Sequence, residues 1–186
     1  QTCALPISRI IRAFPAATWR EAPTLWDEKG NSAEKLKDGK ANPTYSPFAE
    51  AFSKMVEEFG LLHKLERVDR LSGIAHYGAL FLGFSDTADV SQPVAKGAKL
   101  LYLAPYGEIG AQIATFETNP ADPRFGLPKA YNLRSTSVDG RQVPSAQVVN
   151  VHPSRVIHVA EFLDDNEVYG QPRLKPIINR LMDIEK

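Results

Sequence analysis

Four histidines are the side chains of this sequence best suited to acid–base or metal chemistry: His63, His76, His152 and His158. None of them belongs to an H-E-x-x-H helix motif, and a single cysteine cannot complete a zinc site. His152 and His158 are six positions apart, which would put them on the same face of an uninterrupted strand, but Pro153 interrupts it. We therefore expect one histidine in a turn and one in a strand, with no metal ion between them.

The segment His152-Pro153-Ser154 has the H-x-S form found in one half of a two-histidine phosphoesterase. That chemistry needs two such motifs, because one histidine acts as the general acid and the other as the general base. The other three histidines are not followed two positions later by serine or threonine. The sequence therefore predicts no phosphoesterase centre.

An acidic loop follows the last predicted strand. Asp164, Asp165 and Glu167 offer the oxygen atoms that Mg²⁺ and Ca²⁺ prefer, but their spacing differs from that of an EF-hand. Phosphate-binding glycine loops and the dinucleotide fingerprint are also missing from the sequence. We expect a solvated loop, and we predict no catalytic, cofactor-binding or metal-binding residues and no cofactor.

Charge and composition exclude several classes of protein. The 186 residues include 22 Lys+Arg and 22 Asp+Glu, a formal net charge of +0, which argues against a chain-wide basic surface for gripping nucleic acid. Arg9, Arg12 and Arg20 lie among apolar residues, where arginines more often pair or lie along apolar surface than bind phosphate. No apolar run reaches the ~20 residues of a membrane helix. We expect one globular domain, or one domain and part of another.

Helical spacing of apolar residues predicts two helices in the first half of the chain. The first covers Phe48–Leu62, with Ser46 as its N-cap, Pro47 at its first position and Gly60 near its end. The second covers Leu65–Tyr77, with Val68 and Ile74 among the residues that face inward. The preceding segment, Ser8–Trp26, is expected to be broken into short pieces by Pro15 and Pro23.

Strand patterns dominate the rest of the chain. The continuous apolar run Ala79–Phe84 predicts a strand buried on both faces. Asp139-Gly140 predicts a hairpin turn between two strands. The further strands that we expect are Lys99–Leu103, Ala111–Glu117, Ala130–Ser135, Gln142–Val151 and Arg155–Ala160. The fold class is therefore α+β, with the N-terminal helices packed on a mixed, mainly antiparallel sheet.

Both ends of the chain are unusual. Residues 1–7, which contain the only cysteine, look like the translation of a common sequencing adapter, so we leave them out of fold reasoning. At the other end, an apolar stripe at helical spacing predicts a helix without an end signal. Its members are Leu174, Ile177, Ile178, Leu181 and Ile184. We therefore interpret the chain as an internal fragment of a longer protein.

Four segments taken in order resemble a tailed-phage portal family, also labelled an anti-CBASS-protein-like N-terminal domain. They are RIIRAFPAATWRE, LERVDRLSGIAHYGALFLGFSD, LLYLAPYGEIGAQIATFETNPADPRFGLPKAYNL and VHPSRVIHVAEFLDDNEVYGQPRLKPIINRLMDIEK. The best-matching pieces are Tyr77–Phe84, Asp122–Pro128, and Ser154–Val159 with Tyr169-Gly170. The likeness extends over nearly all of residues 8–186 and is specific as an ordered set.

The resemblance implies a structural subunit of a closed ring of about a dozen copies at a capsid vertex. Phage DNA would pass through the ring without sequence-specific contacts, and terminase, capsid and head–tail connector proteins would dock on it. Residues 8–170 would form a wing-like α/β domain, and residues 171–186 the start of a stem helix. The protein would belong to the virion, after assembly in the host cytoplasm, with neither enzymatic activity nor membrane contact. The alternative is the N-terminal region of an anti-CBASS cyclic-oligonucleotide phosphodiesterase fusion, with its catalytic part downstream.

Overall fold

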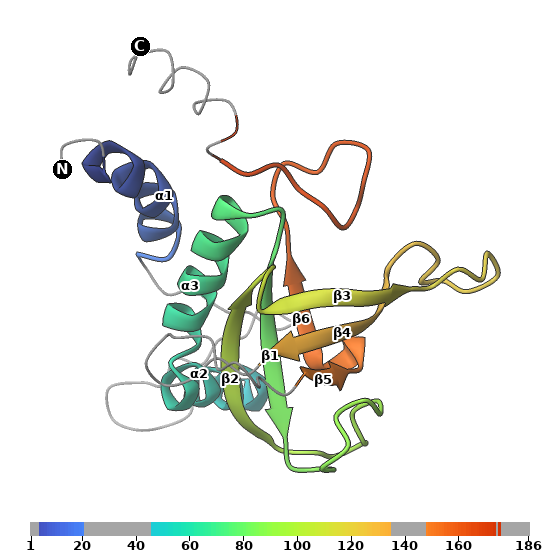
Figure 1. Cartoon of the computed structure of the whole chain (residues 1–186). Coiled ribbons are helices and arrows are strands. Elements are labelled where there is room, and N and C mark those ends of the chain that lie inside the picture. The colour runs from blue at the N-terminus through green and yellow to red at the C-terminus, as the bar shows by residue number, and fades with distance from the viewer. Residues whose placement is uncertain (1–3, 21–45, 135–147, 174, 176–186) are drawn as a thin grey trace, which may run out of the picture.

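The architecture was obtained from a computed structural model, which describes residues 4–20, 46–134, 148–173 and 175. Within these residues, three α-helices accompany two three-stranded antiparallel sheets, which confirms the α+β class (Figure 1). The helices are α1 (Ala4–Thr18), α2 (Pro47–Phe59) and α3 (Leu61–Ile74). The strands are β1 (Gly78–Phe84), β2 (Leu100–Gly107), β3 (Ala111–Phe116), β4 (Pro128–Arg134), β5 (Val148–Val151) and β6 (Val156–Val159), and the 3-10 turn η1 (Pro153–Arg155) joins the last two.

Local signals fix both ends of α2 as the sequence predicts. The Ser46 hydroxyl accepts a hydrogen bond from the Ala49 N–H at 3.4 Å, and Pro47 takes the first helical position. Gly60 ends the helix in the left-handed region, with φ 56°. Because Gly60 also turns the chain, α3 begins at Leu61, earlier than predicted, and it ends at Ile74, before the chain enters β1.

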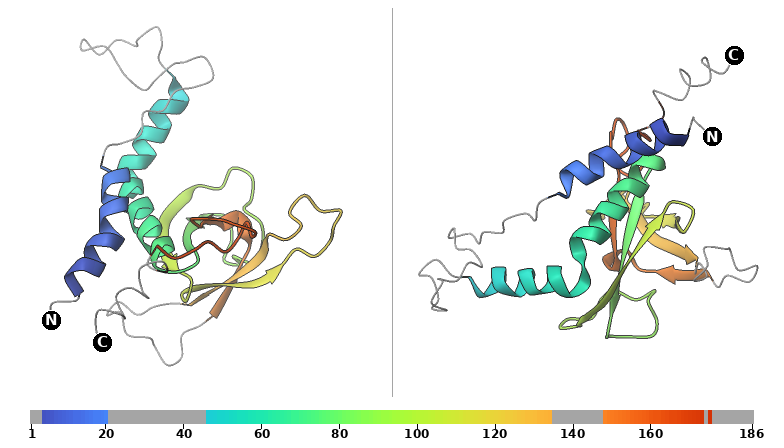
Figure 2. Two further views of the ribbon diagram at one scale, coloured as in Figure 1. Left: turned by 90° about the horizontal axis from the view of Figure 1, so that it is seen from above. Right: turned by 90° about the vertical axis from the view of Figure 1, so that its left-hand side faces the viewer.

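The prediction that Pro15 breaks the N-terminal segment is wrong, because Pro15 lies inside α1. It occupies the last turn, where the missing N–H removes one intrahelical bond without preventing the next: the Trp19 N–H donates to the Pro15 carbonyl at 2.9 Å. The Pro15 ring is also fully buried, which offsets part of that loss. Helix α1 packs along α3 (Figure 2).

The strands divide into two sheets with the orders β2-β1-β6 and β3-β4-β5. All strand pairs in the described residues are antiparallel. The register places Leu80 opposite both Pro105 and Ile157. Within β1, Gly83 allows a close cross-strand approach, since a Cβ there would lie 2.4 Å from the Tyr102 ring.

Strand β1 lies between two apolar clusters, which confirms that it is buried on both faces. Ala79 and Phe81 face the second sheet, where they join Ala111, Leu133 and Val151. Leu80 points the other way because side chains alternate along a strand. It joins Leu61, Val68 and Leu103 under α2 and α3.

Several predictions fall on residues that the structure does not describe. The hairpin turn at residues 139–140 is among them, and so is the terminal apolar stripe, residues 174–184. Ile74, predicted to face inward, is 48% exposed, because the inward face of α3 is centred on Val68 and Ser72. In the described ranges, the helices lack the length and apolar character that a membrane crossing requires.

Candidate functional site: two buried arginines and a histidine at the sheet junction

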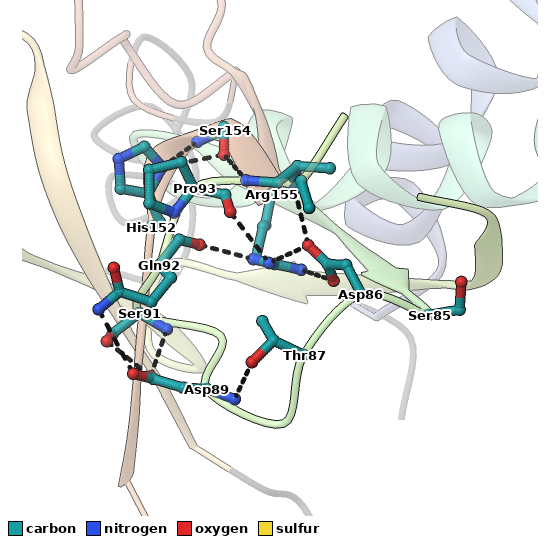
Figure 3. Close-up of polar contacts among 12 residues, drawn as sticks. Ser85, Asp86, Thr87, Asp89, Ser91, Gln92, Pro93, His152, Ser154 and Arg155 are labelled. Carbon is teal, nitrogen blue, oxygen red and sulfur yellow. Dashed lines mark hydrogen bonds and ion pairs between the residues drawn. The ribbon is translucent and has the colours of Figure 1, made fainter. Parts of the chain in front are cut away.

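Arg155, the last residue of η1, is completely buried, and each of its three guanidinium nitrogens donates a hydrogen bond (Figure 3). Its Nη1 donates to Asp86 Oδ1 at 2.9 Å and its Nη2 to Asp86 Oδ2 at 2.6 Å. Its Nε donates to the Gln92 carbonyl at 3.0 Å, and Nη2 also reaches the Pro93 carbonyl at 3.4 Å. All of these acceptors belong to the loop 85–98. Arg155 therefore fastens that loop to the strands and has no donor turned toward solvent.

The loop 85–98 is also held by hydrogen bonds to the turn at residues 152–154. The Val94 N–H donates to Ser154 Oγ at 3.1 Å, and the His152 N–H donates to the Val90 carbonyl at 2.9 Å. The Ala95 N–H donates to Asp86 Oδ2 at 2.9 Å. Hydrogen bonds from Arg155 and from this amide hold the pKa of Asp86 well below its ordinary value. The carboxylate is therefore a permanent charge at physiological pH.

His152 lies in the turn, as predicted, and caps η1. The Ser154 N–H donates to His152 Nδ1 at 3.2 Å, and the Ser154 hydroxyl lies 2.9 Å from the same nitrogen (Figure 3). Burial lowers the pKa of His152, and the cations of Arg124 and Arg155 lower it further. The H-x-S segment therefore closes on itself as a local cap, which supports a structural role for this histidine.

His158, the predicted strand histidine, joins the two sheets. Its Nε2 lies 2.7 Å from the Val168 carbonyl, which can only accept, so we assign the ring proton to Nε2. Nδ1 then accepts from the Tyr131 hydroxyl at 3.1 Å. Its ring stacks on Tyr77 with centroids 4.6 Å apart. Burial lowers the pKa of His158 and raises the pKa of Tyr77 to about 12.

A second arginine, Arg173, joins α1, α3 and the segment after β6. Its Nε donates to Glu161 Oε2 at 2.7 Å, and its Nη2 contacts both Glu161 Oε1 and Asp69 Oδ1. The Trp19 indole donates to Asp69 Oδ2 at 2.8 Å, which ties α1 to the same carboxylate. Gly73 leaves room for the guanidinium, since a Cβ there would lie 2.8 Å from Arg173 Nη1.

The pKa values of the two carboxylates beside Arg173, Asp69 and Glu161, are shifted in opposite directions. Burial acts to raise the pKa of Asp69, but a hydrogen bond shared with protonated Glu161 and those donated by Arg173 and Trp19 outweigh it, and the pKa falls below its ordinary value. Burial and the neighbouring Asp69 raise the pKa of Glu161. On acidification Glu161 is therefore expected to take up a proton before Asp69 does.

The other predicted candidates do not gather into a site. Arg9, Arg12 and Arg20 are exposed, and in the part of the chain that the structure describes none of them forms an ion pair. Asp164, Asp165 and Glu167, the acidic residues singled out from the sequence, are exposed. No group of three or more His, Cys, Asp or Glu side chains within the described ranges is arranged to hold a metal ion.

Sequence reasoning missed both arginine networks. Arg155 and Asp86 are 69 positions apart, and Arg173 and Asp69 are 104 apart, so local spacing carries no signal of either pair. The nearest hint is that Ser154–Val159 is among the pieces that carry the family resemblance. Within the described residues, Arg173 Nη1 is buried without a hydrogen-bond partner, whereas the other guanidinium nitrogens of Arg155 and Arg173 donate to protein atoms. The chemistry of both networks is that of cross-links between distant segments.

Comparison with known protein families identifies the family to which the matched range belongs. A family model described as phage portal protein matches residues 45–186. The matched range contains both arginines, His158 and both sheets, and it leaves out α1. No curated protein matches the chain.

Proposed function

Because this chain belongs to the phage portal protein family, whose model covers residues 45–186 and so well over half of it, we propose that it is a structural subunit of the ring at one vertex of a phage capsid. Membership of the family implies that the protein is associated with the virion and takes part in an oligomeric assembly. The proposal adds a closed ring around a DNA channel. It also adds docking of terminase during packaging and of head–tail connector proteins afterwards.

The surface of the domain supports assembly with other protein chains. Several large apolar side chains are about half exposed or more, including Leu101 at 55%, Tyr102 at 52% and Ile109 at 69%. Single exposed apolar residues are normal, but ring formation offers these side chains neighbours that a monomer lacks. The formal net charge of +0 suits a channel in which DNA must slide, since many Lys–phosphate and Arg–phosphate contacts would bind it tightly.

The proposed role includes no catalysis. Arg155 and the turn histidine are engaged by protein atoms, and the single H-x-S segment forms a cap rather than half of an acid–base pair. The phosphodiesterase-fusion alternative requires a second such motif elsewhere. We expect no cyclic-dinucleotide hydrolysis by this chain, and turnover that disappears in His152→Ala would contradict the structural role.

The decisive experiment is negative-stain microscopy of the full-length protein. We expect closed rings with a central channel. The sequence spacing puts Leu181 in the middle of the terminal apolar stripe, so Leu181→Asp is expected to prevent ring formation. A wild-type protein that stays monomeric at every concentration would overturn the proposal.

A further inference from the structure

The loop 161–171 exposes two apolar side chains to solvent, and hydrogen bonds at its two ends form a closed neck. The Gln171 N–H donates to the Glu161 carbonyl at 2.8 Å, and the Gly170 N–H donates to the His76 carbonyl at 2.9 Å. Beyond this neck, Phe162 is 62% exposed and Leu163 is 48% exposed. Phe162 has φ 51°, a conformation that non-glycine residues rarely adopt. The neck hydrogen bonds and this backbone conformation thus keep the two side chains, the loop tip, away from the core.

The loop tip is surrounded by negative charge. Asp164, Asp165 and Glu167 are all exposed, and residues 161–171 contain no lysine or arginine. The Gln171 amide donates to Asp164 Oδ2 at 3.1 Å, which keeps this carboxylate beside the neck. A surface that fits the loop tip must therefore combine an apolar contact with positive charge.

Helix α3 carries a surface of that kind, which we call the α3 stripe: His63, Arg67, Arg70 and Ile74. These residues are spaced by four, three and four positions, so they share one face of the helix. His63 and Arg67 are exposed, Arg70 is half-buried, and Ile74 is 48% exposed. In the described part of the chain, neither Arg67 nor Arg70 forms an ion pair.

We propose that the loop tip of one copy docks on the α3 stripe of a second copy of this chain, with Phe162 and Leu163 against Ile74 and the acidic rim against Arg67 and Arg70. The inference rests on the proposed ring function. Within one copy, the α3 stripe lies on the face of α3 opposite the buried Val68 and Ser72. The neck of the loop is hydrogen-bonded beside the C-terminal end of α3, and the loop projects from there away from the helix (Figure 1). Because the two surfaces of one copy do not face each other, we assign the contact to neighbouring copies, in a head-to-tail arrangement that a ring can repeat.

Charge reversal tests the contact. Arg67→Glu/Arg70→Glu and Asp164→Lys/Asp165→Lys each place like charges across the interface, so each is expected to weaken self-association of the full-length protein at least about tenfold in sedimentation velocity. The chain that carries all four substitutions regains opposite charges, and we expect its association to recover. Lys96→Glu/Lys99→Glu, a reversal at two exposed lysines outside both surfaces, is the matched control and should leave association unchanged.

Cross-linking locates the contact independently of affinity. In a background without other cysteines, Leu163→Cys with Ile74→Cys should give a ladder of disulfide-linked multimers on oxidation, whereas Thr118→Cys with Ile74→Cys should not. One combination of results overturns the docking proposal and leaves the portal function standing: the wild type forms rings, both charge-reversed variants form rings equally well, and no disulfide ladder appears. If the wild type never associates, the ring proposal and the docking proposal both fail.

Discussion

Arg155 donates to both carboxylate oxygens of Asp86, a residue 69 positions earlier in the chain, and the two side chains are only 0% and 2% exposed. Asp86 follows β1 and Arg155 precedes β6, and these two strands pair directly. The ion pair therefore closes the same end of the sheet that the strand hydrogen bonds hold. A buried pair of this kind adds little relative to an apolar pair, but it is costly to break, because the remaining charge is left without a partner.

We predict that Arg155→Ala lowers the free energy of unfolding by about 3–5 kcal/mol, because it leaves the buried Asp86 carboxylate without its ion-pair partner. Urea denaturation followed by circular dichroism measures the change. Lys129→Ala is the control, since Lys129 is 61% exposed in its ion pair with Glu117 and its removal should barely move the midpoint. Equal midpoints for the two variants would show that Arg155 is not structurally required.

The depressed pKa of Asp86 predicts an acid-labile fold. Because the folded pKa lies below the ordinary value of 3.8, the ionised carboxylate stabilises the fold fully above that value. The stabilisation is lost as the pH falls below about 3.8 toward the folded pKa. We expect Asp86→Asn to be less stable than wild type at neutral pH and to lose less further stability between pH 4 and pH 2. Parallel pH profiles for the two proteins would contradict this linkage.

Local patterns were enough to predict α2 and β1. Ser46, Pro47 and Gly60 act on their immediate neighbours, so their roles can be inferred from spacing alone. The continuous apolar run of β1 likewise predicted burial on both faces. Pro15 shows the limit of such rules, because its tolerance in α1 depends on burial, a property that the sequence pattern does not contain.

The ion pairs and hydrogen bonds by which Arg155 and Arg173 join distant segments could not be predicted from the sequence. Gly73 admits the Arg173 side chain, yet a glycine at a helix end is commonly explained as a cap. The pairing of the strands into two sheets depends on which apolar faces meet, and the alternation within each strand does not specify its partner. The fold class could thus be predicted, whereas the two arginine networks required the structure.

His158 should titrate below the ordinary histidine pKa of 6.5, because burial disfavours its charged form. A lowered histidine pKa means that the unfolded chain binds the proton more readily, so stability should fall as the pH drops below about 6.5. Nitrogen-15 NMR of the ring should also show the proton on Nε2 at pH 7. Tyr131→Phe removes the hydroxyl that donates to Nδ1, and we expect it to raise this pKa and to cost about 0.5–1.5 kcal/mol of stability. A wild-type ring protonated on Nδ1 would refute the assignment.

Gly170 and Glu161 are in such close contact that no side chain fits between them. A Cβ on Gly170 would lie 2.0 Å from the Glu161 carbonyl oxygen and 2.7 Å from its nitrogen, and both atoms belong to the backbone. We therefore predict that Gly170→Ala opens the neck of the loop 161–171 and lowers the free energy of unfolding by roughly 2 kcal/mol or more. Hydrogen exchange followed by mass spectrometry should report faster exchange at the Gly170 and Gln171 amides. The matched control is Gly107→Ala, where the nearest atom to a Cβ is Leu71 Cδ2 at 3.5 Å, an ordinary contact. Unchanged exchange in Gly170→Ala, at the level of this control, would mean that the neck does not hold the loop closed.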